Sequence, residues 1–376
     1  MDLHADFIVV GAGIAGASVA YWLARDARVL VLERESQPGY HSTGRSAALF
    51  MESYGTAQVR ALTMASRAFL EAPPPGFADQ PVLGPRGAMF VATHGQEAQL
   101  QAHWDVLRQL SPHGRLLTSA EACEITPVLR PEMVVGAAYE PDAADMDVHA
   151  IHQGYLRGVR RSGGRIVTDA EVRALRHDGT AWTVETAAGT FGAPALVNAA
   201  GAWADVLGQL AGARPLGLQP KRRSAFIFAP PPGVDVSRWP LTAGAGEDWY
   251  FKPDAGMLLG SPANVDPVDP HDVQPEELDI AIAIDRIQTM TTMTIRRPTR
   301  TWAGLRSFVP DGDLVGGWDE QAPRFFWVAA QGGYGIQTSP AMGEACAALI
   351  RGEPLPARIA AFGLTAGMLA AGRKAP

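Results

Sequence analysis

Apolar and polar positions alternate at the start of the chain in an order that predicts a βαβ unit. Residues 7–10 form a short, β-branched apolar run, and the small residues at 15–24 then follow a helical pattern. A second apolar run, 29–32, ends at Glu33. This order predicts a strand, a helix and a second strand, joined as in a βαβ unit.

The same kinds of pattern continue through the rest of the chain. Helical spacing of apolar residues predicts two further helices, at 57–70 and 147–161. Apolar and alternating runs predict strands at 165–167, 183–186, 195–201, 224–228, 249–252 and 325–330. Ser339 followed by Pro340 is typical of an N-cap and a first helical residue, so a last helix is predicted from there to Arg351.

The order of these elements predicts two domains. The chain has 376 residues, which exceeds the size at which one hydrophobic core stops growing. The runs around the first βαβ unit predict an α/β domain with a Rossmann-like fold, and the turn-rich stretches predict an α+β domain with a mostly antiparallel or mixed β-sheet. We expect the first domain, which binds the cofactor, to comprise residues 1–80, 146–215 and 307–376. The second, substrate-binding domain is then 81–145 and 216–306.

Charge and composition narrow the kinds of partner. The formal net charge of −7 provides no basic surface for nucleic acid. The two cysteines, Cys123 and Cys346, lack the spacing of a metal site or a disulfide framework. The N-terminus lacks the features of a signal peptide, and the most apolar later stretch, 195–213, is interrupted by polar residues. We therefore expect a cytoplasmic protein with no metal, no transmembrane segment and no nucleic-acid partner.

The turn after the first predicted strand carries the spacing G-x-G-x-x-G, at Gly11, Gly13 and Gly16. Glycines at this place allow backbone N–H groups and a helix N-terminus to approach a pyrophosphate. Glu33 ends the second strand, where a carboxylate accepts hydrogen bonds from a ribose diol and repels a 2′-phosphate. The motif therefore predicts FAD or NAD rather than NADP and leaves the choice between these two open.

A second glycine-rich turn, residues 331–335, favours FAD over NAD. It leads into the last predicted helix, whose N-terminus offers another partial positive charge. A reduced flavin is an anion that such a dipole stabilises. The sequence thus predicts FAD as the cofactor.

Two arginines are the best candidates for binding a substrate carboxylate. Arg223 and Arg306 both lie in apolar or turn-rich surroundings, and a guanidinium binds a carboxylate through two parallel hydrogen bonds. Tyr54 and Tyr250 are candidate hydroxyl partners. Arg222 should face the other way in a strand. No histidine receives a role, and no G-x-S-x-G motif indicates a serine hydrolase.

Several long segments together resemble the D-amino-acid oxidase superfamily of FAD-dependent oxidoreductases. Within it, they are most similar to the bacterial FAD-dependent D-arginine and D-amino acid dehydrogenases. The resemblance spans nearly the whole chain and is carried by residues 6–18, 42–48, 218–226, 302–308 and 331–337. It implies a two-domain fold, with the substrate between the flavin and a β-sheet.

The resemblance also implies where the cofactor binds. Glu33 would bind the adenosine ribose, Val172 would offer backbone atoms to the adenine, and Gly44 and Ser46 would lie along the flavin. Relatives that attach the flavin covalently use a cysteine near the segment where this chain has Phe308, so we expect non-covalent FAD. The full set of expected cofactor contacts is Gly11, Gly13, Ala15, Gly16, Glu33, Arg34, Thr43, Gly44, Ser46, Val172, Ala200, Gly201, Trp203, Gly332, Gly333, Tyr334, Gly335, Ile336 and Gln337.

For the substrate, the resemblance implies a carboxylate held by Arg223 and Arg306 with Tyr54 and Tyr250. The Gly304 carbonyl would hold the amine, and Gln337 would stand near substrate and flavin. The chemistry would be hydride transfer from the α-carbon, followed by hydrolysis of the imino acid to a 2-oxo acid and ammonia. No side-chain base is then obligatory.

Two departures from the arginine-oxidising relatives point to a less polar pocket. Ala88 stands where they carry a carboxylate, and Leu49 stands where they carry a histidine. With Phe50 and Met51 adjacent, we expect a preference for apolar or aromatic D-amino acids over D-arginine. Glu52 is an alternative source of the missing charge.

Two other functions stay open on the sequence. One is an amine oxidase of the same superfamily that acts on glycine, sarcosine or another secondary amine. The other is a dinucleotide-binding protein without redox activity. The choice of dehydrogenase over oxidase and the D-stereochemistry rest on the resemblance alone, and the electron acceptor, a quinone or another carrier, is not specified by it.

Overall fold

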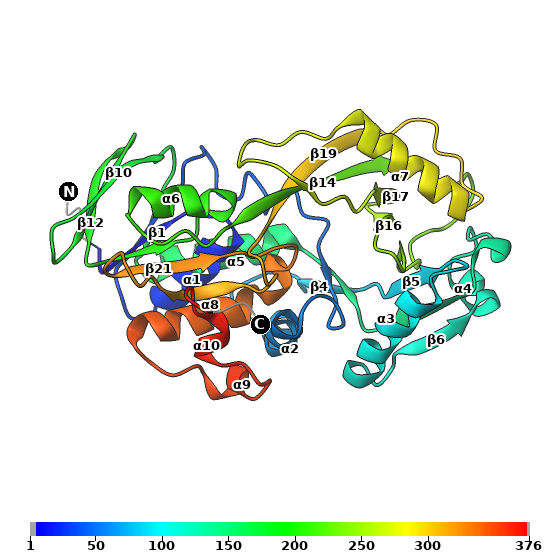
Figure 1. The fold of residues 1–376 in the computed structure, drawn as a ribbon, viewed down its shortest axis with the longest axis horizontal. Coiled ribbons are helices and arrows are strands. Elements are labelled where there is room, and N and C mark those ends of the chain that lie inside the picture. Colours follow the sequence, from blue (N-terminus) through cyan, green and yellow to red (C-terminus); the bar gives the residue numbers. More distant parts are fainter. Residues whose placement is uncertain (1–4, 374–376) are drawn as a thin grey trace.

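The computed structural model describes residues 5–373, and its first sheet is built around the predicted βαβ unit (Figure 1). Six strands lie in the order β20-β21-β13-β1-β2-β9. All neighbouring strands run parallel except β20 and β21. The strands are β1 (Phe7–Val10), β2 (Val29–Leu32), β9 (Arg165–Val167), β13 (Ala195–Asn198), β20 (Val315–Trp318) and β21 (Phe325–Ala329).

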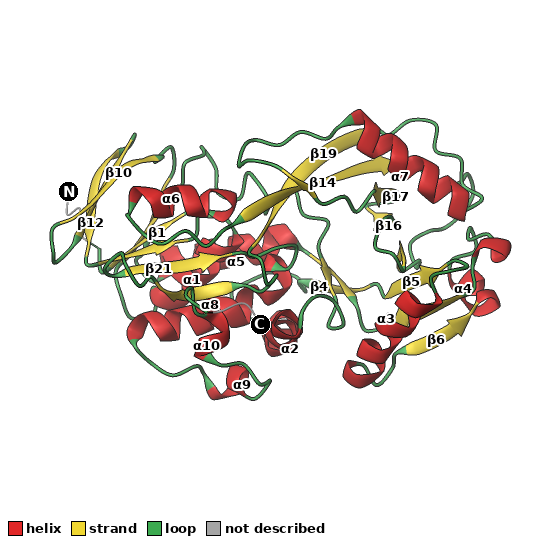
Figure 2. Ribbon diagram, viewed as in Figure 1, coloured by secondary structure: helices red, strands yellow, loops and turns green. Residues whose placement is uncertain are grey.

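Helices cover one face of this sheet, and a small sheet and a short helix lie on the other side (Figure 2). The covering helices are packed on one another through α1, which contacts α5 and α8, while α8 also contacts α2. They are α1 (Ile14–Leu23), α2 (Ala57–Glu71), α5 (Val148–Arg161) and α8 (Gly335–Arg351). The elements on the other side are α6 (Ala204–Leu210), β10 (Val172–His177), β11 (Trp182–Thr186) and β12 (Gly189–Ala193).

A second sheet of nine strands forms the other half of the molecule. Its order is β18-β14-β17-β16-β15-β5-β7-β6, and β19 pairs with β14 at the side. The strands are β5 (Ala88–Ala92), β6 (Arg115–Thr118), β7 (Gly136–Glu140), β14 (Gln219–Phe228), β15 (Leu241–Gly244), β16 (Tyr250–Asp254), β17 (Met257–Ser261), β18 (Asp266–Pro267) and β19 (Arg300–Phe308). In Figure 1 the long strands β14 and β19 extend from this half toward the first sheet. They therefore carry side chains to the junction of the two halves.

A three-stranded sheet lies where the chain passes between the halves. It consists of β3 (Leu49–Phe50), β8 (Ala144–Met146) and β4 (Leu83–Pro85), in that order. The remaining helices are α3 (Glu97–Leu110), α4 (Ser119–Ile125), α7 (Glu277–Met290), α9 (Ala357–Ala360) and α10 (Ala366–Leu369), with short 3-10 turns at Pro131–Met133 and Gly201–Trp203. Helices α3 and α7, which the sequence patterns did not indicate, pack against strands of the second sheet.

The start of the last helix differs from its prediction. Helix α8 begins at Gly335, and Pro340 lies inside it rather than at its first position. The proline has no N–H for the carbonyl of Ile336, but the Ser339 hydroxyl donates to that carbonyl at 2.9 Å. Because α8 begins at Gly335, its N-terminus lies directly after the glycine turn 331–334.

The mixed α/β and α+β architecture agrees with the predicted fold class. The exact domain boundaries stay a prediction, and their ends at residues 1–4 and 374–376 lie outside the described residues. Within residues 5–373, no helix has the length and apolar character that a membrane span requires.

Candidate functional site

The turn between β1 and α1 is so tight that two of its three motif glycines leave no space for a side chain. Gly11 has φ +100°, a conformation that favours glycine, and a Cβ on it would lie 2.4 Å from the Ala199 carbonyl oxygen. A Cβ on Gly16 would lie 1.8 Å from the Gly11 carbonyl oxygen. Gly13 is less crowded, because the nearest atom to its Cβ would be Thr43 Oγ1 at 3.3 Å. Gly11 and Gly13 line a cavity, whereas Gly16 supports the turn from behind.

Glu33 closes this cavity at the end of β2. Its carboxylate accepts a hydrogen bond from the Ala12 N–H at 2.8 Å and another from the Glu35 N–H at 3.0 Å. The side chain is buried, yet it lines the cavity. Its position relative to the glycine turn is the one that a ribose diol requires.

Replacing Glu33 with glutamine is expected to weaken FAD binding about tenfold or more. The glutamine amide oxygen accepts hydrogen bonds less strongly than a carboxylate, and the amide NH2 group would face the backbone N–H groups that the carboxylate now accepts from. The dissociation constant can be measured from the quenching of FAD fluorescence by the FAD-free protein. Glu35→Gln, which removes the same charge two residues away, is the control and should change affinity much less. Equal affinities in wild type and Glu33→Gln would contradict this role.

The far end of the cavity has aromatic and apolar walls. The Arg34 guanidinium lies 4.7 Å from the centre of the Trp203 ring, and the His41 ring packs at a tilt of 51° against the same ring, with centres 4.7 Å apart. On α6, Val206 and Leu210 are 48% and 42% exposed although both face the cavity. Such exposed apolar surface fits the planar base of a dinucleotide, which would cover it. Ala15, Val172, Ala200 and Gly201, which are expected to contact the cofactor, line the same cavity.

A second cavity continues from the first toward the second sheet. Both cavities share part of their lining, which comprises Ile14, Ser42, Thr43, Leu305, Gln331 and Gly332. Thr43 Oγ1 accepts a hydrogen bond from the Ile14 N–H at 3.0 Å and so fixes the junction to the start of α1. Ser46, Gly333, Gly335, Ile336 and Gln337 line the second cavity. A long cofactor with a pyrophosphate at the first turn can therefore reach from one cavity into the other.

Arg223 and Arg306 enter the second cavity from the paired strands β14 and β19. Arg223 is opposite Gly304 in the register, so Arg306, two residues further along β19, points to the same face. Arg223 Nε donates to the Asn264 carbonyl at 2.7 Å, which orients its guanidinium. Arg222 points to the opposite face, as predicted, and pairs with acidic side chains there.

Both guanidinium groups are cations at neutral pH. Burial and the neighbouring Arg306 charge lower the pKa of Arg223 to about 10. Burial also acts to lower the pKa of Arg306, but its interactions with the phenol groups of Tyr54 and Tyr250 outweigh this effect and raise it. Two buried positive charges side by side form a strong site for a carboxylate.

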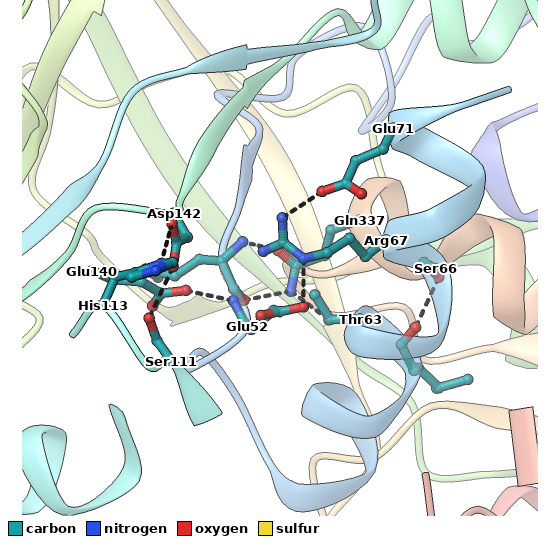
Figure 3. A network of polar contacts seen from close by, with 12 residues as sticks. Glu52, Thr63, Ser66, Arg67, Glu71, Ser111, His113, Glu140, Asp142 and Gln337 are labelled. Carbon is teal, nitrogen blue, oxygen red and sulfur yellow. Dashed lines mark hydrogen bonds and ion pairs between the residues drawn. The ribbon is translucent and has the colours of Figure 1, made fainter. Parts of the chain in front are cut away.

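The loop that carries Tyr54 is held by a network of polar contacts (Figure 3). Gln337 accepts from the Met51 N–H at 3.2 Å and donates to Thr63 Oγ1 at 2.9 Å. The buried carboxylate of Glu140 accepts from the Glu52 N–H at 2.9 Å and from the Ser53 hydroxyl. Burial raises the pKa of Glu140. These contacts fix the loop that places the Tyr54 phenol beside Arg306.

Apolar side chains form the rest of the cavity wall, and here two predictions are corrected. Leu49 and Met51 line the cavity, but Phe50 between them points into the core of the first half, because successive strand residues face opposite sides. Ala88 is fully buried behind the wall and backs it rather than lining it. Glu52 pairs with Arg67 at 2.7 Å and does not supply a charge to the cavity.

Three further predicted residues lie beside the cavities without lining them. Gly44 donates its N–H to the Gly39 carbonyl at 2.8 Å and shapes the loop before Ser46. The Tyr334 ring packs edge-on against Tyr54 with ring centres 5.2 Å apart. With Gly16, these residues support the walls of the cavities.

The backbone at Gly304 limits one predicted role. The carbonyls of Ala303 and Leu305 accept hydrogen bonds from the side chains of Arg45 and Ser42, so they point away from β14. The Gly304 carbonyl between them therefore faces β14, where Arg223 is its partner in the register. Binding of an amine at this carbonyl requires its second lone pair and stays a prediction.

The sequence patterns missed part of the lining. Phe90, Leu241 and Ala243 extend the apolar wall, and Trp302 and Trp249 add aromatic surface. Only Trp249 lies in a predicted strand, 249–252; the other four lie in β5, β15 and β19, which the sequence patterns did not indicate. Glu247 is also in the lining, and no motif in the sequence indicated it.

The fold and these joined cavities define a dinucleotide-dependent oxidoreductase, and comparison with known proteins gives its family. A family model described as FAD dependent oxidoreductase (DAO) matches residues 6–349. Glycine oxidase from Geobacillus kaustophilus is 25% identical over 379 residues, which cover 96% of this chain and 96% of that protein. Glycine oxidase from Bacillus subtilis is 24% identical, covering 93% of this chain and 94% of that protein.

Solved structures share the fold. The crystal structure of Geobacillus kaustophilus glycine oxidase has a TM-score of 0.84 at 24% identity and covers 96% of this chain and 99% of its own. L-alpha-Glycerophosphate oxidase from Mycoplasma pneumoniae, solved with FAD bound, has a TM-score of 0.84 at 17% identity. The match covers 93% of this chain and 95% of that chain. The chain belongs to the DAO family of FAD-dependent oxidoreductases, and FAD is its cofactor.

Proposed function

We propose that this enzyme catalyses the oxidative deamination of D-amino acids with apolar or aromatic side chains, as a dehydrogenase with non-covalently bound FAD. The products are the 2-oxo acid and ammonia. The observation that carries this proposal is the pair of guanidinium groups of Arg223 and Arg306 facing a largely apolar wall in one cavity. The pair suits an α-carboxylate, and the wall suits an uncharged side chain.

The protein groups bind and orient the substrate. Arg306 and Arg223 hold the substrate's carboxylate. The hydroxyl groups of Tyr54 and Tyr250, which interact electrostatically with both guanidinium groups, complete the hydrogen bonds of that carboxylate. Bound FAD would supply the acceptor for a hydride from the substrate's α-carbon. The two positive charges also lower the pKa of a nearby ammonium group and so favour the neutral amine that the reaction needs. A positioned substrate can therefore react without a side-chain base.

The apolar wall predicts the order of substrates. We expect kcat/KM for D-leucine and D-phenylalanine to exceed that for D-arginine by about tenfold or more, because Leu49, Met51 and Phe90 offer no partner to a guanidinium and the carboxylate in the lining, Glu247, already interacts with Arg223. Bleaching of the visible flavin band after anaerobic addition of each amino acid measures the reaction. A higher kcat/KM for D-arginine would contradict the preference, and reduction by L-leucine alone would contradict the stereochemistry.

Oxidation of glycine or another small amine is the second candidate, since proteins named glycine oxidase match over almost the whole chain. Against it, glycine would leave the wall formed by Leu49, Met51 and Phe90 without a contact. Glycine and sarcosine, added to the same anaerobic assay, separate the two candidates. A faster reduction by either of them than by D-leucine would favour the second.

A further inference from the structure

One carboxylate in the wall of the substrate cavity has no part in the function proposed above. Glu247 lies in the turn between β15 and β16 and lines the cavity with Arg223 and Tyr250. The residue is exposed to solvent, and its charge acts to raise the pKa of the Arg223 guanidinium and of the Tyr334 phenol as a minor contribution beside that of burial. Glu247 is therefore within electrostatic range of the group that binds the substrate's carboxylate.

The turn holds Glu247 at a fixed place. Its φ is 52°, in the left-handed region that residues with a Cβ rarely adopt. Hydrogen bonds tie the turn to three neighbouring elements: Ala245 N–H to the Val91 carbonyl at 2.8 Å, His103 Nε2 to the Ala245 carbonyl at 3.2 Å, and Arg286 Nη1 to the Asp248 carbonyl at 2.6 Å. Together with the hydrogen bond from the Glu247 N–H to the Gly244 carbonyl at 2.9 Å, the contacts from β5, α3 and α7 hold the backbone in this conformation.

The charges around the cavity are matched to one carboxylate. Its lining includes the cations Arg45, Arg223 and Arg306 and the anion Glu247. Arg45 is paired with Asp272 outside the cavity, which leaves two positive charges and one negative. One substrate carboxylate neutralises the remaining positive charge, whereas a second would stay uncompensated near Glu247.

We propose that Glu247 is a specificity-determining residue that restricts the cavity to substrates with a single carboxylate and excludes dicarboxylates, including amino acids with acidic side chains. Repulsion of the wrong ligand is a common source of selectivity. The inference rests on the proposed function only in that this cavity receives a carboxylate substrate.

Two ligands of nearly the same shape test this. Glutarate and its monoamide, glutaramate, differ by one negative charge and carry no amine to oxidise. Their dissociation constants can be measured on the FAD-loaded enzyme by titrating the visible flavin spectrum. We expect wild type to bind glutaramate about tenfold or more tighter than glutarate, and Glu247→Gln to reduce that ratio at least about fivefold.

The controls use the same turn. Asp248→Asn removes an equal charge from the next residue, which does not line the cavity, and should keep the wild-type ratio. Glu247→Asn, which tolerates the left-handed backbone, is the second variant and should behave like Glu247→Gln. A ratio that stays within twofold of wild type in both Glu247 variants overturns the inference, as does failure of both ligands to bind wild type. Because neither ligand needs to react, a failure of D-amino acids to reduce the flavin is a separate result, and it counts against the proposed function alone.

Discussion

Replacing Arg306 with methionine is expected to raise KM for D-leucine about a hundredfold or more. The Arg306 guanidinium lies among Tyr54, Tyr250 and the backbone of Gly333. It is so close to this backbone that a Cβ added to Gly333 would lie 2.8 Å from Arg306 Cζ. Loss of a buried, charge-assisted pair costs about 3 kcal/mol, which corresponds to a factor of this size. Methionine keeps the unbranched apolar part of the side chain and removes the guanidinium, so the fold should change little.

The same loss should appear in direct binding of a carboxylate ligand, measured by titration of the flavin spectrum. Arg300→Met is the matched control, because Arg300 is on the same strand but exposed and outside the cavity lining. KM and the ligand dissociation constant should stay near wild type in that variant. An unchanged KM in Arg306→Met would remove Arg306 from the substrate site.

The sequence predicted the parts of the site that depend on local geometry. The spacing of Gly11, Gly13 and Gly16 between a predicted strand and helix indicates a tight turn, and Glu33 marks the end of the neighbouring strand. Opposite orientations of Arg222 and Arg223 follow from the twofold repeat of a strand. In each case the decisive contacts lie close in sequence or follow from a regular period.

Features that depend on distant segments were not predictable in this way. The sequence shows that the side chains of Leu49, Phe50 and Met51 should alternate between two faces. Which of these faces meets the cavity depends on the pairing of β3 with β8. Helix α7 contains Leu278, Ile280 and Ile282 at every second position, a pattern that resembles a strand. Packing against β14 and β17 makes this segment a helix and leaves Leu278 67% exposed.

Glu247 shows the same limit at the level of chemistry. An acid in a glycine-containing turn has the sequence appearance of an exposed loop residue, and Glu247 is exposed, but it also lines the cavity. Its place in the cavity is set by hydrogen bonds to Val91 and by contacts from α3 and α7, all distant along the chain. The apolar pocket expected from Leu49 and Ala88 therefore contains a negative charge that the sequence did not reveal.

Two alanine substitutions in the glycine turn are expected to remove FAD by different routes. In Gly16→Ala the new methyl group would collide with the Gly11 carbonyl oxygen at 1.8 Å, so the turn must move. Overpacking of this kind costs about 3 kcal/mol of stability. In Gly13→Ala the backbone, at φ −71°, accepts alanine, and the nearest atom to the Cβ is 3.3 Å away. Its methyl group then occupies space that the cofactor's pyrophosphate needs.

Both variants should bind FAD about a hundredfold or more weakly, measured by fluorescence quenching, but only Gly16→Ala should lower the unfolding temperature of the FAD-free protein. Gly84→Ala, where a Cβ meets nothing within 4 Å, is the control for the loss of a glycine and should keep both properties. Normal FAD affinity in Gly13→Ala would show that the pyrophosphate does not approach this turn. Because bound FAD itself stabilises the fold, the unfolding temperature must be compared without it. The pair thus separates a glycine that the fold requires from one that the cofactor requires.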